Sequence, residues 1–226
     1  MNFLVRKVHK YLSFFISLQL LLWTVSGIYF AFNKIELVRG EQYRKQVEQS
    51  INLGDFDFEI PNTTDVSIQK RLGENIAVIK VDGTTKYLNR SGESISKLTE
   101  SEAMNLVISN TTLSPVLVEE IVNERSGSEY RGRSLPIYKV ESKTNKDLDI
   151  NVYLNVYSGE VLAIRSNQWR IWDFMWGLHI MDWKERDNIS NILLKIFSIL
   201  ALVSSVTGVM LFFKLDFKNN KILITK

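Results

Sequence analysis

Two long apolar segments lie near the two ends of this chain. The first covers residues 11–32 without a charged side chain, and the second covers 192–213 with one charge, Lys195, close to its start. A helix of about 22 residues rises about 33 Å, enough to cross a hydrocarbon core of about 30 Å. Both segments are therefore predicted to span a membrane, and Lys195 lies where its ammonium can reach the headgroups.

A cleaved signal peptide is the main alternative for the first segment. Arg6, Lys7 and Lys10 form a basic region before it, and the small residues Ser26 and Gly27 occur near its end. However, the segment is longer than the usual apolar region of about 7–15 residues, and no A-x-A cleavage pattern follows it. The prediction is an uncleaved anchor.

The charges that flank the two segments predict the orientation. The basic residues before the first segment are matched after the second by Lys214, Lys218, Lys221 and Lys226. Basic flanks stay in the cytoplasm, whereas a long connecting domain crosses regardless of its charge. We expect a protein of the bacterial inner membrane with both termini in the cytoplasm and residues 34–190 in the periplasm.

The region between the spans has the pattern of an α+β domain. Residues 55–60 alternate carboxylate and apolar side chains, which predicts a strand with Phe56, Phe58 and Ile60 inward. A hairpin of strands at 76–81 and 84–88 is predicted around Asp82-Gly83, because a type I′ turn needs positive φ at both central residues.

The second half of that domain is predicted as helix followed by strands. Thr99 and Glu102 form a capping-box pattern before an apolar helix. A second helix is expected at 116–122, and strands at 137–141, 148–156 and 161–165.

Composition excludes several kinds of chemistry. The net charge of +3 comes largely from the basic tails and gives no sign of nucleic-acid binding. The chain has no cysteine, which excludes disulfides, thiolate metal sites and cysteine nucleophiles. The sequence also contains no phosphate-binding glycine loop, zinc-type ligand spacing or flavin-attachment motif.

Residues 168–183 hold four of the five tryptophans and one of the two histidines, the other being His9. The spacing of three and four residues would place one set of side chains on a single helical stripe. This set is Trp169, Trp172, Trp176, His179 and Trp183. Such a stripe suits the outer membrane interface, where tryptophan rings lie at headgroup level.

Motifs at both ends resemble the PepSY-associated transmembrane family. Residues 6–10 (RKVHK), before an apolar helix ending in Ser26-Gly27, are similar to the family's R-K-x-H…S/T-G pattern. Residues 153–161 (YLNVYSGEV) resemble its V/Y-x-D-x-x-T-G-E-V turn, and residues 169–179 (WRIWDFMWGLH) its W-R…D-F-x-x-x-L-H element. A second S/T-G, Thr207-Gly208, follows. Two departures occur: Asn155 and Ser158 replace Asp and Thr, and residues 181–186 (MDWKER) replace a glycine-rich stretch.

The apolar runs, their charged flanks and the resemblance together predict an architecture and its boundaries. Two transmembrane helices would flank a periplasmic PepSY-like α+β domain, and two chains would form a dimeric four-helix bundle. The expected parts are a first segment 1–33, the domain 34–166, a Trp-rich interfacial helix 167–188, a second span 189–213 and a cytoplasmic tail 214–226.

The resemblance also implies a function. Larger members include haem-containing reductases of ferric siderophores, and this short form resembles the two-span VciB-type members that support iron uptake. His9 and His179 would be axial ligands of haem iron, because neutral imidazole suits that role. They are expected on opposite sides of the membrane, about 30 Å apart. A homodimer would therefore hold two haem b groups, and electrons would pass from an unknown cytoplasmic donor to ferric iron.

Other assignments of the same residues stay open. Trp172, Trp176 and Trp183 could wall a haem from water, and Met175 or Met181 could replace one histidine as ligand. His9 could instead be an interfacial cation beside Arg6. The carboxylates of Asp55, Asp57 and Glu59 could bind ferric iron, but such a row is more often the solvated face of an edge strand.

Small residues in the spans, among them Ser13 and the Ser204-x-x-x-Gly208 pair, favour close helix packing. The alternative function is a membrane-anchored PepSY module without a cofactor, which inhibits or scaffolds a periplasmic partner.

Overall fold

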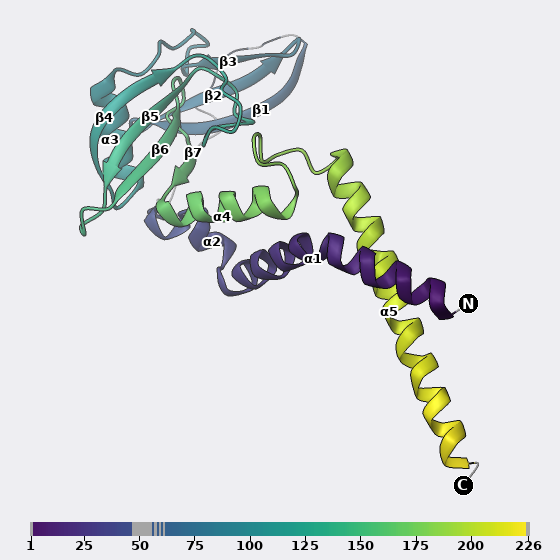
Figure 1. Cartoon of the computed structure of the whole chain (residues 1–226). Coiled ribbons are helices and arrows are strands. Elements are labelled where there is room, and N and C mark those ends of the chain that lie inside the picture. Colours follow the sequence, from purple (N-terminus) through teal and green to yellow (C-terminus); the bar gives the residue numbers. More distant parts are fainter. Residues whose placement is uncertain (1, 47–55, 57, 59, 61, 225–226) are drawn as a thin grey trace. The chain divides into compact units, whose positions relative to one another are not determined.

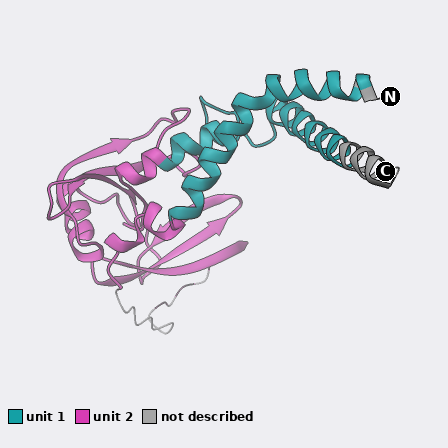
Figure 2. Ribbon diagram, turned by 60° about the horizontal axis from the view of Figure 1, so that its bottom comes forward, with its two compact units in different colours: residues 1–33, 172–226 teal, residues 34–171 magenta. Residues whose placement is uncertain are grey.

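The computed structural model describes residues 2–46, 56, 58, 60 and 62–224. The chain divides into two compact units, coloured separately in Figure 2. We call Met1–Asn33 with Trp172–Lys226 the helical unit, and Lys34–Ile171 the α+β unit. Helix α4 (Asn167–His179) begins in the second unit and ends in the first.

The helical unit is built on two long helices, α1 (Asn2–Phe32) and α5 (Ile192–Ile224), which Figure 1 shows crossing each other. Both are long and apolar enough to cross a bilayer, over Val5–Phe32 and Ile192–Phe213. The rings of Phe15 and Phe197 stack at 5.8 Å, and His9 lies beside Ser204. The two helices therefore run antiparallel along their contact.

Most apolar side chains of the two spans face away from the protein. Only 17 % and 6 % of the two most apolar stretches are buried, and Phe14, Leu18 and Leu202 are examples of large exposed side chains. An apolar surface of this extent is unfavourable in water and suits contact with lipid or with another apolar helix. This pattern agrees with two membrane-spanning helices.

The α+β unit holds two antiparallel sheets, each with its strands in sequence order. The first sheet contains β1 (Thr63–Arg71), β2 (Glu74–Val81) and β3 (Thr84–Leu88). The second contains β4 (Ser114–Ile121), β5 (Ile137–Lys143), β6 (Asp149–Asn155) and β7 (Val161–Arg165). Short helices α2 (Ile35–Val38) and η1 (Glu41–Tyr43) precede the sheets, and α3 (Glu100–Asn110) connects them.

The second sheet is covered on both faces. Along β6, Val152 and Leu154 belong to the core that includes Leu106 and Val107 of α3. Tyr153, which points to the opposite face, packs in a separate cluster with Ile137 and Ala163. This alternation is the period-2 pattern of a strand whose two faces are both buried.

Local sequence signals predicted much of this unit correctly. The Asp82-Gly83 hairpin is present, with φ of 49° and 77°, and it joins β2 to β3. Thr99 and Glu102 form both bonds of the capping box at the start of α3. The three strands expected after Pro136 are β5, β6 and β7.

The helix expected at 116–122 is wrong, because residues 116–121 lie in β4. Val118 is opposite Val140 in the ladder with β5, and only Val118 of the strand is well buried. The apolar pattern did not distinguish helix from strand over such a short segment, and pairing with β5 decided it.

The strand predicted at 55–60 falls partly outside the described residues, which include none of Asp55, Asp57 and Glu59. Phe56, Phe58 and Ile60 are described; they lie in no strand. Their side chains pack inward against the cluster formed by Ala77, Ile79, Val81 and Leu88 of the first sheet, as the alternation predicted.

Candidate functional site

His9 is held between the two spanning helices. Its Nδ1 lies 3.1 Å from the carbonyl oxygen of Ser204 and 3.0 Å from Thr207 Oγ1, both on α5. Ser13, one turn along α1, bonds to Ser204 through the two hydroxyls at 2.7 Å. We call His9, Ser13, Ser204, Thr207 and Gly208 the His9 site.

Gly208 permits the close approach of the imidazole. A Cβ at this position would lie 3.1 Å from Cε1 of His9, closer than ordinary van der Waals contact. The small-residue pair Ser204 and Gly208 therefore brings α5 against α1 within one chain.

His179 is the last residue of α4 and lies against the second half of α1. Its Nδ1 is 2.8 Å from Oγ of Ser26, a fully buried side chain. Trp23 Nε1 donates to the His179 carbonyl at 2.6 Å, and Gln19 Nε2 donates to the Leu178 carbonyl at 3.3 Å. The bond from Trp23 satisfies a carbonyl that the end of a helix leaves without an intrahelical partner.

Aromatic rings surround one side of His179. The ring of Trp176 lies nearly parallel to the imidazole, with an interplanar angle of 10° and ring centroids 6.3 Å apart. Trp172 stacks on Trp176 with ring centroids 5.6 Å apart. Phe30 of α1 contacts Trp172, Trp176 and the imidazole. Burial lowers the pKa of His179 below its ordinary value, which favours the neutral imidazole. We call His179, Ser26, Phe30, Trp172 and Trp176 the His179 site.

The hydroxyl groups determine which imidazole nitrogen carries the proton. The Ser26 hydroxyl donates its single proton within α1, 2.7 Å from the Leu22 carbonyl, and Thr207 donates its own to the Val203 carbonyl at 2.8 Å. Each oxygen is then left with lone pairs and accepts from Nδ1–H of the histidine. The Ser204 carbonyl can only accept, so its bond to His9 also requires a proton on Nδ1. With the hydroxyl protons placed in this way, the neutral form of each imidazole carries its proton on Nδ1 and leaves Nε2 unprotonated.

Each histidine therefore contacts the S/T-G pair of the other motif. His9, from the first motif, meets Thr207 and Gly208 of the second, and His179 meets Ser26 of the first. The contacts touch α1 at positions 9 and 26, about 25 Å apart along a helix rising ~1.5 Å per residue. One chain therefore cannot bring both imidazoles to a single metal ion.

The predicted aromatic stripe divides into three parts. Trp169 is buried in the α+β unit, where the guanidinium of Arg165 lies 4.3 Å from its ring. Trp172 and Trp176 join His179. Helix α4 ends at His179, so Trp183 lies beyond it and is 58 % exposed. A stripe that runs from Trp169 to Trp183 on one helix is therefore wrong.

The methionines differ in their surroundings. Met175 is half-buried on α4, and Met181 is buried with φ of 56° just after the helix. Among the described residues there is no group of three or more His, Asp or Glu side chains arranged to hold a metal ion.

The segment after His179 is organised by one carboxylate. Asp182 accepts from the backbone N–H groups of Glu185, Asp187 and Asn188 at 3.0–3.1 Å. Burial alone would raise the pKa of Asp182, but these backbone bonds together lower it. Arg186 forms an ion pair of 2.8 Å with the buried Asp173 of α4.

The start of α4 is fixed separately within the α+β unit. Glu129 accepts from Arg170 at 2.6 Å, from Asn151 at 2.7 Å and from the Tyr153 hydroxyl at 3.0 Å. Burial lowers the pKa of Arg165, whose Nε donates to the Glu129 carbonyl, to about 10. The W-R pair of the motif thus anchors the helix that carries His179.

Sequence reasoning missed several of these partners. Ser26, Thr207, Trp23 and Phe30 were not predicted to contact a histidine. The signal for two of them was present, because each S/T-G pair was visible as a motif, but nothing local indicates which histidine it meets.

The comparisons with known proteins give one result. A family model described as the PepSY-associated TM region matches residues 6–225. No curated protein and no solved structure matches the chain.

Proposed function

Since the chain belongs to the PepSY-associated transmembrane family, we propose that it binds haem through His9 and His179 and passes electrons across the membrane to ferric iron outside. The observation that carries this proposal is the state of the two imidazoles. The Nδ1 atom of each imidazole lies within hydrogen-bond distance of a hydroxyl. In the neutral imidazole this bond leaves Nε2 unprotonated, which is the form that ligates iron.

The residues of the two sites fit an axial ligand role. Hydrogen bonding of the distal nitrogen fixes the tautomer and ring orientation of a metal-ligating histidine and raises its basicity. Ser26 and Thr207 supply this bond. Bound haem would supply an iron centre that accepts and releases single electrons. The rings of Phe30, Trp172 and Trp176 cluster on one side of His179, where they would limit the access of water to a bound haem.

The proposal includes a homodimer. One chain offers one imidazole at each site, and a second copy related by a two-fold axis would bring each histidine to its equivalent. The exposed apolar faces of α1 and α5 would pack as a four-helix bundle. The proposed place is the inner membrane, with the termini and the electron donor in the cytoplasm.

Haem content tests the proposal directly. Purified parent protein should show a Soret band and about two haem groups per dimer by pyridine hemochrome, and His9→Ala and His179→Ala should each remove about half. Trp183→Ala is the matched control, since this exposed ring lies outside both sites. A colourless parent, or mutants with the parent's haem content, would reject the assignment and favour a module without cofactor.

The orientation needs its own measurement. A reporter active only in the periplasm should give signal when fused after Gln49 and none after Lys226, because basic flanks stay in the cytoplasm. The reverse pattern would place the two histidine sites on the opposite sides from those proposed.

A further inference from the structure

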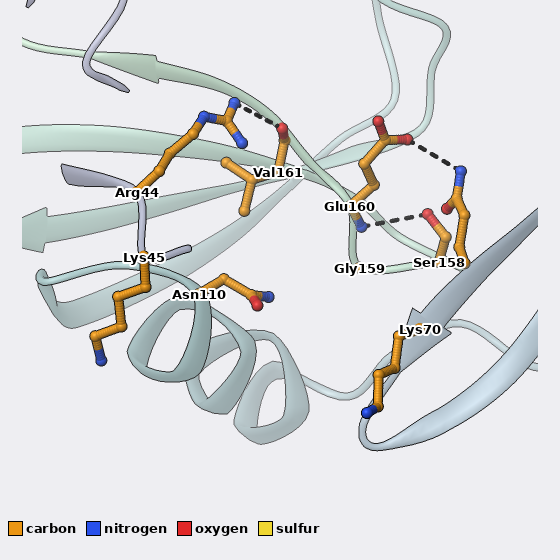
Figure 3. Close-up of a pocket in the computed structure, with 9 residues that line it drawn as sticks. Arg44, Lys45, Lys70, Asn110, Ser158, Gly159, Glu160 and Val161 are labelled. Carbon is orange, nitrogen blue, oxygen red and sulfur yellow. Dashed lines mark hydrogen bonds between the residues drawn. The ribbon is translucent and has the colours of Figure 1, made fainter. Parts of the chain in front are cut away.

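A polar pocket of about 260 Å³ lies within the α+β unit (Figure 3). Four segments that are distant in sequence line it: the residues after η1, the end of β1, the last residue of α3 and the β6–β7 turn. The side chains that matter for binding are Arg44, Lys45, Gln69, Lys70, Asn110 and Glu160.

The walls of the pocket are fixed before any ligand arrives. Arg44 Nη2 donates to the Val161 carbonyl at 3.0 Å, and Lys45 Nζ donates to the Ile108 carbonyl at 2.7 Å. In the β6–β7 turn, the Ser158 hydroxyl accepts from the backbone N–H of Glu160 at 3.2 Å. A pocket that is already formed loses little conformational entropy when it binds.

The charge of the pocket favours an anion. Arg44, Lys45 and Lys70 are positive, and Glu160 is the one carboxylate that lines it; Glu41 nearby pairs with Arg44 at 3.2 Å. Counting both carboxylates, one positive charge remains in excess. Within the described residues, neither the Lys70 ammonium nor the Asn110 side-chain amide has a hydrogen-bond partner, so both are free donors.

An unpartnered acceptor adds a second requirement. Oε1 of Gln69 is buried without a hydrogen-bond partner, while Nε2 of the same amide points to Glu160 Oε2 at 3.4 Å. Buried polar atoms are almost always paired in folded proteins. A ligand that offers a hydroxyl proton here and carboxylate oxygens to Lys70 and Asn110 would satisfy all three groups.

We propose that this pocket binds a small hydroxycarboxylate. Its carboxylates accept from Lys70, Asn110 and Arg44, and its hydroxyl donates to Gln69. The site is independent of haem and of the iron function proposed above, since all its residues belong to the α+β unit.

Calorimetric titration of the full-length protein in detergent with citrate tests the proposal. Tricarballylate, which has the same three carboxylates without the hydroxyl, is the matched ligand. Citrate should bind about tenfold more tightly than tricarballylate, and this preference should disappear in Gln69→Met. Equal binding of both ligands by the parent would remove the role of Gln69, and no binding of citrate would overturn the proposal.

Two variants locate the site. Lys70→Gln and Asn110→Ala should each weaken citrate binding about tenfold without loss of folding, because neither group bonds to the protein. Lys86→Gln, the same charge change at an exposed position of β3, should bind like the parent. Equal weakening in Lys70→Gln and Lys86→Gln would indicate attraction to the net charge alone and would overturn the proposal.

Discussion

The His9 site and the His179 site use the same chemical device in different surroundings. In both, a helical hydroxyl donates to its own backbone and accepts from Nδ1 of a histidine on another helix. His9 has a second acceptor, the Ser204 carbonyl, and it lies against a glycine. His179 has only Ser26 at Nδ1 among the described residues, but aromatic rings surround it. His9 is therefore positioned by close helix packing, and His179 by one hydroxyl and its aromatic neighbours.

The largest expected difference comes from the two glycines of the S/T-G pairs. Gly208→Val should push α5 from His9 and destabilise the helix pair by about 1–3 kcal/mol, the usual cost of overpacking. Gly27→Val should be tolerated, because a Cβ at position 27 meets nothing within 4 Å. Thermal unfolding of both variants in detergent measures the difference, and equal losses would contradict the structural distinction.

Removal of the hydroxyls should affect His179 more than His9. Ser26→Ala leaves Nδ1 of His179 without its partner, whereas Thr207→Ala leaves His9 the Ser204 carbonyl. A typical hydrogen bond contributes about 1 kcal/mol, enough to change the tautomer ratio severalfold. Because the chain has two histidines, ¹⁵N-histidine NMR of the haem-free protein resolves both.

The controls for that experiment lie on the same helix. Ser26→Thr should restore the Nδ1–H tautomer, since threonine can also donate to the carbonyl one turn before it. Ser17→Ala removes an equivalent exposed hydroxyl, which donates to Phe14, and should change neither histidine. A His179 tautomer that is unaffected by Ser26→Ala would mean that Ser26 does not position the ring.

Loss of one aromatic ring should affect the His179 site and leave the His9 site unchanged, and we expect this difference to be smaller than those above. Trp176→Leu removes the ring that lies parallel to His179 and stacks on Trp172, contacts worth about 0.5–1.5 kcal/mol. If haem is bound at both sites, only the potential of the His179 site should shift, because burial helps to set it. Potentiometric titration of parent and variant checks this, and a shift at both sites would contradict it.

The smallest effect is expected from acid acting on the loop after His179. The lowered pKa of Asp182 means that its carboxylate stabilises the fold fully above about pH 4, the value of the free group, and loses this contribution as the pH falls through its folded pKa. In the parent protein, the Asp187 and Asn188 amides should therefore lose protection from hydrogen exchange only at acid pH. In Asp182→Asn these amides should be less protected at neutral pH as well, while amides of α1 near His9 stay unchanged.

The sequence by itself determined the features that depend on near neighbours. The two spans follow from long apolar runs, the hairpin from Asp82-Gly83, and the start of α3 from Thr99 and Glu102. The turn before β7 also needs only local bonds, because Asn155 Oδ1 accepts from the N–H groups of Tyr157 and Ser158, as an aspartate could. Each of these interactions closes within a few residues, so a local pattern specifies it.

The tertiary structure decided which distant residues meet. The partners of His9 lie 195 and 198 positions away, and Ser26 lies 153 positions from His179. The end of α4 at His179 removes Trp183 from the stripe, and strand pairing with β5 makes residues 114–121 a strand. Periodicity shows which residues share one face of a helix or strand. Which other element packs against that face depends on the tertiary structure. The chain therefore displays both histidines and both S/T-G pairs, and only the packing of α1, α4 and α5 assigns each hydroxyl to its imidazole.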